Sequence, residues 1–173
     1  MNSTVTDTER YRTARKRLWA AIVDSILFMP LLLVARYLVY PTNNENLIIA
    51  WQTFMVFIPL VYSIVGHYKY GLTVGKWAAD IKVLDKTESK LITLRQSFVR
   101  DSFYVAVEIA GFIYYLTLSL KTGDKTYLYN GFYSFSDFPF LIWTLLELVT
   151  MLTNEKRRAI HDYMANSVVV RTR

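Results

Sequence analysis

The sequence predicts an all-helical membrane protein: a bundle of four transmembrane helices, with both termini in the cytoplasm and a small cytoplasmic β-element. Of its 173 residues, 53% are hydrophobic, 16% are aromatic and only 20% are charged. Four long apolar runs lie at residues 18–40, 47–65, 98–120 and 132–153, and the basic residues gather between them in an uneven pattern. We therefore expect residues 1–173 to form a single membrane domain.

Each apolar run is close to the length of about 20 helical residues that crosses a bilayer core. The first run contains Asp24 and Arg36 as its only charges. It is too long for the apolar part of a cleaved signal peptide, which also lacks acids. The second run has no charge and is interrupted only by Pro59, which transmembrane helices tolerate. The fourth begins in an aromatic stretch at 127–138, which is typical of an interfacial belt.

The basic residues predict the orientation. Most of the 20 lysines and arginines lie before the first run, in the loop at 66–97, or after the fourth run. Cytoplasmic flanks carry the excess of basic residues, so these segments are expected in the cytoplasm. We expect this basic face to bind anionic lipids. Nucleic acid is not an expected partner, because the composition is too apolar for a wet, cationic binding surface.

Three short β-prone segments lie on the cytoplasmic side. Residues 81–85 and 91–94 flank a polar turn at 86–90, a pattern that predicts a hairpin. The β-branched run at 167–172 is expected to pair with this hairpin, forming a small sheet beneath the helices.

Four acids within the apolar runs are the candidate ion or proton pathway: Asp24, Asp101, Glu108 and Glu147. Ionisable residues are costly inside a membrane, so they are functional candidates by default. The alternative is structural, in which each acid pairs with an arginine or a tyrosine hydroxyl and locks helices together. Both interpretations remain open at this point.

A glycine-rich segment contains Gly71, Thr73, Gly75 and Lys76. Its spacing does not fit a phosphate-binding loop. We expect a turn that redirects the chain along the membrane surface, with Lys76 and Trp77 at the lipid headgroups. The chain has no cysteine, its two histidines are far apart, and no spacing indicates a hydrolase. We therefore expect no metal site, no cofactor and no enzymatic activity.

Three motifs in order resemble the RDD family of small polytopic membrane proteins. They are Arg17 with Asp24 in the first run, the segment 71–85, and Arg-Arg-Ala-Ile-His-Asp at 157–162 followed by the run at 167–170. The resemblance covers about residues 10–172 and departs at 166–167, where Asn-Ser replaces the usual Gly-Thr. It implies a multi-pass protein of the prokaryotic inner membrane, with Arg17, Asp24 and Asp162 as signature residues. Some members of that family are linked to sodium/proton antiport.

We expect a cytoplasmic-face cluster of Arg17, Asp24, Arg100, Asp101 and Asp162. Two functions then compete. The first is a cation/proton transporter, or a subunit of one, that uses the intramembrane acids. The second is a non-enzymatic membrane scaffold or assembly partner of another membrane protein. Because no internal repeat is visible, transport predicts a homo-oligomer or a partner protein.

Overall fold

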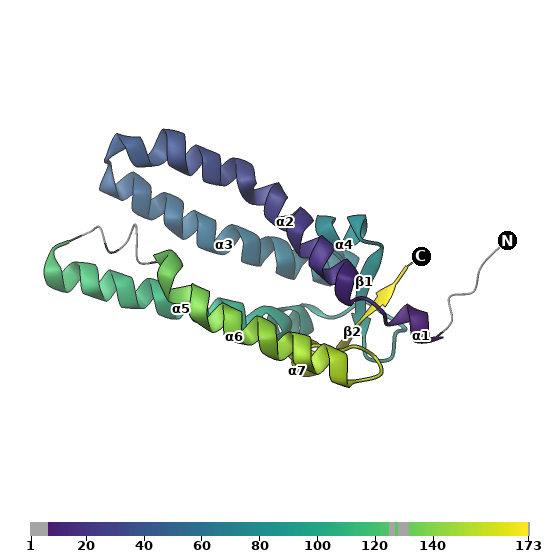
Figure 1. The fold of residues 1–173 in the computed structure, drawn as a ribbon. Helices are drawn as coiled ribbons and strands as arrows, with labels where there is room; N and C mark the ends of the chain where they lie inside the picture. The colour runs from purple at the N-terminus through teal and green to yellow at the C-terminus, as the bar shows by residue number, and fades with distance from the viewer. Residues whose placement is uncertain (1–6, 125–126, 128–131, 173) are drawn as a thin grey trace.

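The computed structural model describes residues 7–124, 127 and 132–172 (Figure 1). Helices dominate it, with a two-stranded sheet at one end. The elements, in order, are α1 (Asp7–Arg10), α2 (Ala14–Val34), η1 (Ala35–Val39), η2 (Tyr40–Thr42), α3 (Glu45–Tyr70), α4 (Val74–Ala78), β1 (Ile81–Asp85), α5 (Leu94–Thr122), α6 (Phe132–Thr153), α7 (Ile160–Met164) and β2 (Ser167–Arg171).

Three helical segments are long and apolar enough to cross a membrane: Ala14–Thr42, Glu45–Tyr70 and Leu94–Thr122. They contain the apolar runs predicted at 18–40, 47–65 and 98–120. The fourth predicted run coincides with α6, whose apolar part within the searched residues, Phe138–Thr153, is shorter. Large apolar side chains such as Leu33, Phe57 and Leu145 point outward from these helices. Outward-facing apolar side chains are what a lipid environment favours.

The long helices run beside one another, and α1, α4, α7 and both strands gather at one end of them (Figure 1). Helix α3 packs against α5, α5 packs against α6, and α2 packs against α4. Ring contact between Phe28 and Tyr62, at 5.3 Å between centroids, joins α2 to α3. We call the end that carries α4, α7 and both strands the sheet end.

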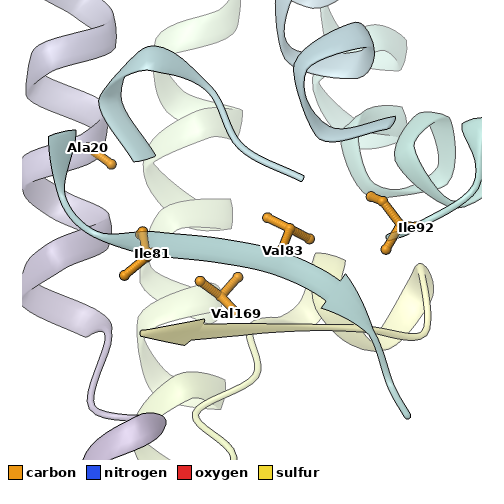
Figure 2. Close-up of a cluster of buried hydrophobic side chains, with 5 residues drawn as sticks. All are labelled: Ala20, Ile81, Val83, Ile92 and Val169. Carbon is orange, nitrogen blue, oxygen red and sulfur yellow. The ribbon is translucent and has the colours of Figure 1, made fainter. Parts of the chain in front are cut away.

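Strands β1 and β2 pair antiparallel, with a register running from Ile81 opposite Arg171 to Asp85 opposite Ser167. Figure 2 shows the apolar core that the sheet builds with α2: Ala20, Ile81, Val83, Ile92 and Val169, none more than 2% exposed. The prediction that the C-terminal run pairs with residues 81–85 is confirmed.

The predicted hairpin is wrong. Residues 91–93 form no strand, and α5 begins at Leu94. The reason is a capping box: Thr93 accepts from the backbone N–H of Gln96, and the Gln96 side chain accepts from the N–H of Thr93. Such a box fixes the start of a helix. Ile92 still contributes its side chain to the core, although its backbone leaves the sheet.

Candidate functional site

Asp24 anchors three helices to one another near the sheet end. Its carboxylate accepts hydrogen bonds from the hydroxyls of Tyr62 and Thr73 and from the backbone N–H of Gly75, each at 2.7 Å. Gly75 lies so close to α2 that a Cβ there would be 2.0 Å from the carbonyl oxygen of Ala20. Only glycine permits this approach, so the glycine-rich segment seats α4 directly on α2.

That seating turns Lys76 inward. The neighbouring Trp77 is 69% exposed, in keeping with a residue at the headgroups. Lys76 instead lines a cavity between the helices, so its predicted position at the membrane surface is wrong. Successive residues of a helix point about 100° apart. When Gly75 faces α2 and Trp77 faces outward, Lys76 is left to face the interior.

The carboxylate of Asp162 is fully buried and bound from several elements. It accepts from Arg17 Nη1 of α2 at 2.7 Å, from Arg100 Nη1 of α5, from Ser167 Oγ of β2 at 3.2 Å and from the N–H of Ala159 at 3.0 Å. Burial alone would raise the pKa of Asp162, but the charges of Arg100 and Arg17 hold it well below its usual range. We call Arg17, Arg100 and Asp162 the clamp.

A second acid is joined to the clamp through a histidine. Arg100 Nη2 lies 2.7 Å from Nε2 of His161, and His161 Nδ1 contacts Glu147 Oε1. A guanidinium can only donate, so Nε2 accepts and the proton resides on Nδ1, which donates to Glu147. Burial, reinforced by the charge of Arg100, lowers the pKa of His161 and favours this neutral form. Glu147 is thus paired, as the structural interpretation requires.

Asp101 pairs with residues outside the clamp. It accepts from Ser63 Oγ at 2.9 Å, and Nδ1 of His67 lies 3.8 Å away. The expected five-residue cluster is therefore correct for Arg17, Arg100 and Asp162 alone. Asp24 and Asp101 bind other partners, because their side chains meet α3 and α4 before they reach the clamp.

A cavity of about 880 Å³ lies among α2, α3, α5 and α6. All four candidate pathway acids line it. The rest of its wall is mostly apolar, with some polar and basic groups. The charged and polar lining residues are Arg15, Arg17, Asp24, Gln52, Ser63, His67, Lys76, Arg100, Asp101, Tyr104, Glu108, Thr144, Glu147 and His161.

Some of these groups have no side-chain partner within the described part of the chain, among them Glu108, Lys76 and the amide nitrogen of Gln52. Neither the Glu108 carboxylate nor the Lys76 ammonium group makes a hydrogen bond or an ion pair there. Gln52 is 6% exposed, and its buried Nε2 has no hydrogen-bond partner. Burial, reinforced by the charge of Arg100, lowers the pKa of Lys76 to about 8.

Sequence reasoning missed Gln52 and gave Lys76 the wrong direction. Gln52 is a polar residue within an otherwise apolar run, and that contrast could have identified it. Lys76 was singled out, but no sequence signal indicated which way it points. Among the described residues, no group of three or more histidine, aspartate or glutamate side chains could hold a metal ion.

The comparisons with known proteins identify one family. No curated protein and no solved structure matches the chain. The model of the RDD family matches residues 11–166, a range that includes all three clamp residues and Asp24. Together with the three long apolar helices, this match fits a membrane protein. Because the match spans most of the chain, the protein belongs to the RDD family.

Proposed function

We propose that this protein exchanges cations for protons across a prokaryotic inner membrane, as a transporter or a subunit of one, without enzymatic activity. The observation that carries the proposal is Glu108, a carboxylate without a described partner that lines a cavity among the apolar helices. A carboxylate in such a place must be neutralised, by a proton or by a cation. A carboxylate that binds a proton and a cation in turn can exchange one for the other.

The other pathway acids have different roles in this proposal. Asp24 and Glu147 are held by hydrogen bonds, and they shape the cavity wall. Asp101 accepts a hydrogen bond from one hydroxyl and has a histidine nearby. In this proposal it binds the cation transiently before the cation reaches Glu108. Glu108 lies seven residues beyond Asp101 on α5, nearly on the same face and about 10 Å further along the helix axis. A cation entering from the sheet end would pass Asp101 before it reached Glu108.

In this proposal α6 also crosses the membrane, both termini are cytoplasmic, and anionic lipids contact the basic sheet end. The chain has no cysteine, so single cysteines can report topology. We expect Thr122→Cys and Glu155→Cys, on either side of α6, to react with a membrane-impermeant maleimide from opposite sides. Labelling of both from one side would contradict four spans.

Proton flux tests the exchange itself. Purified protein in vesicles containing a pH-sensitive dye is given a gradient of a monovalent cation, with sodium, potassium and a quaternary ammonium ion tested in turn. We expect Glu108→Gln to abolish cation-driven proton movement, because the amide neither binds a proton nor attracts a cation. Glu155→Gln is the matched control, since Glu155 is exposed and lies beyond the end of α6. Unchanged flux in Glu108→Gln would contradict the proposal.

The scaffold function remains the second candidate, and one observation favours it. The side chains of the signature residues Arg17, Asp24 and Asp162 all form hydrogen bonds to other parts of the protein. They therefore support a structural role for the motifs that define the family match. Absence of flux in the wild-type protein, with co-purification of a partner membrane protein, would favour the scaffold. Transport by four helices without a repeat requires a homo-oligomer or such a partner.

A further inference from the structure

We infer that the cavity takes a lipophilic organic cation, with the positive centre at Glu108 and the apolar groups against the cavity wall. This inference rests on the proposed cation/proton exchange and names its substrate class. A compact ion such as sodium is the alternative. Three features favour the organic cation: the size of the cavity, the absence among the described residues of a group of three or more histidine, aspartate or glutamate side chains that could hold a metal, and the aromatic and thioether side chains in the cavity wall.

The size of the cavity suits an organic molecule. At about 880 Å³, it falls within the range of about 300–1,000 Å³ typical of pockets for drug-sized ligands. A hard metal cation instead needs several oxygen ligands at about 2.0–2.6 Å. Among the described residues, no group of three or more histidine, aspartate or glutamate side chains could hold a metal ion, and the Glu108 carboxylate has no hydrogen-bond or ion-pair partner. One carboxylate in a roomy cavity can neutralise a large cation but cannot replace the hydration shell of a small one.

The wall of the cavity offers surfaces that complement a lipophilic cation. Phe140, Tyr104 and Met55 line the same cavity. Aromatic faces attract cations, and a thioether is polarisable and adapts its shape. Gln52 is more than nine-tenths buried and also lines the cavity, and its Nε2 has no partner in the described part. It can therefore bind a polar substituent of the ligand.

The sheet end of the cavity is less suited to a cation. Lys76, Arg17 and Arg100 place positive charge there. The acids at that end already accept hydrogen bonds: Asp24 has three donors, and Asp101 has the hydroxyl of Ser63. Glu108 is the pathway acid with no such donor among the described residues. When Glu108 is protonated in the empty cavity, binding of a monovalent cation releases that proton and leaves the charge of the cavity unchanged.

Equilibrium binding of tetraphenylphosphonium tests the inference. The probe is titrated into purified full-length protein in mild detergent, and binding is corrected for partition into empty micelles. We expect Glu108→Gln to weaken binding by at least about tenfold and Glu108→Asp to retain most of it, because a carboxylate is what the site requires. Glu155→Gln should bind like the wild type. Binding should tighten as the pH rises, since protons compete for Glu108.

Three further outcomes are decisive. Equal binding by Glu108→Gln and the wild type would overturn the inference, provided that thermal unfolding shows both proteins to be folded. Glu108-dependent flux driven by sodium, with no saturable binding of the organic cation, would also overturn the inference but would leave the proposed exchange standing. Failure of both assays in the wild-type protein would overturn both.

Discussion

The clamp and the cavity each contain a carboxylate, Asp162 fully buried and Glu108 partly buried, and the two carboxylates differ in their hydrogen-bond partners. Asp162 in the clamp accepts from two guanidinium groups, a hydroxyl and a backbone N–H. Glu108 in the cavity accepts from nothing within the described residues. A buried carboxylate with a complete set of donors stabilises a fold, whereas one without donors destabilises it. The difference separates residues that hold the protein together from residues that are available to a ligand.

The basic side chains also fall into a paired group in the clamp and an unpaired one in the cavity. Arg17 and Arg100 are paired with Asp162, and Arg100 also donates to Ser167. Lys76 faces the cavity with no hydrogen-bond or ion-pair partner in the described part of the chain. We therefore expect substitutions in the clamp to unfold the protein, and substitutions of the unpartnered groups to leave the fold intact or strengthen it.

The largest effect should come from Asp162→Asn. The amide would leave two buried guanidinium groups without a counter-charge. Breaking a buried ion pair in this way costs about 3–5 kcal/mol. Equilibrium unfolding in mixed detergent micelles measures the loss. Asp80→Asn is the control: Asp80 forms only an exposed ion pair with Lys16 at 3.6 Å, and such a pair contributes at most about 1 kcal/mol. Equal stability of the two variants would contradict the claim that the clamp stabilises the fold.

The seat of α4 comes next. In Gly75→Ala the added methyl group would overlap the carbonyl oxygen of Ala20, so α4 must move away from α2 and from Asp24. Overpacking of this kind costs about 3 kcal/mol. Gly123→Ala provides the comparison, because Gly123 has a φ of +71° but nothing within 4 Å of its Cβ position. Backbone strain alone should cost about 1 kcal/mol. If Gly75→Ala were no more destabilising than Gly123→Ala, the close contact of α4 with α2 would be wrong.

Lys76→Met should act in the opposite direction and stabilise the protein at neutral pH, by about 1–3 kcal/mol, since it removes an unpartnered charge. The pKa of Lys76 falls from 10.5 to about 8 on folding. Between these values the unfolded chain binds more protons, so the stability of the wild type should rise with pH over that window. The rise should be absent in Lys76→Met and present in Lys69→Met, because Lys69 is exposed. A wild-type stability that is flat from pH 8 to 10 would contradict this position for Lys76.

Patterns with a strong local cause were predictable from the sequence. The long apolar runs predicted the three long helices, because length and hydropathy alone decide whether a helix can span a bilayer. The β-branched run at 167–172 predicted β2, since such residues fit a pleated surface. The four candidate acids could be selected from the sequence because charges are rare in apolar runs. All four line one cavity, although no periodicity specified that they would share it.

Partner choice was not predictable. The segment at 91–94 has β-prone residues, yet the capping pair of Thr93 and Gln96 starts a helix there. The donors to Asp24 come from α3 and α4, far away in the sequence, so only the packed structure brings them together. The direction of Lys76 depends on how tightly Gly75 meets Ala20. Each of these is a tertiary contact, and tertiary contacts override local preference.

The smallest expected change in stability gives the most direct test of the account. Unfolding free energy and cation-driven proton flux are measured on the same preparation of Glu108→Gln. We expect this variant to be at least as stable as the wild type, because no described donor loses a partner, and we expect its flux to be abolished. Loss of stability comparable to that of Asp162→Asn, or flux equal to that of the wild type, would contradict the division of this protein into a structural clamp and a functional cavity.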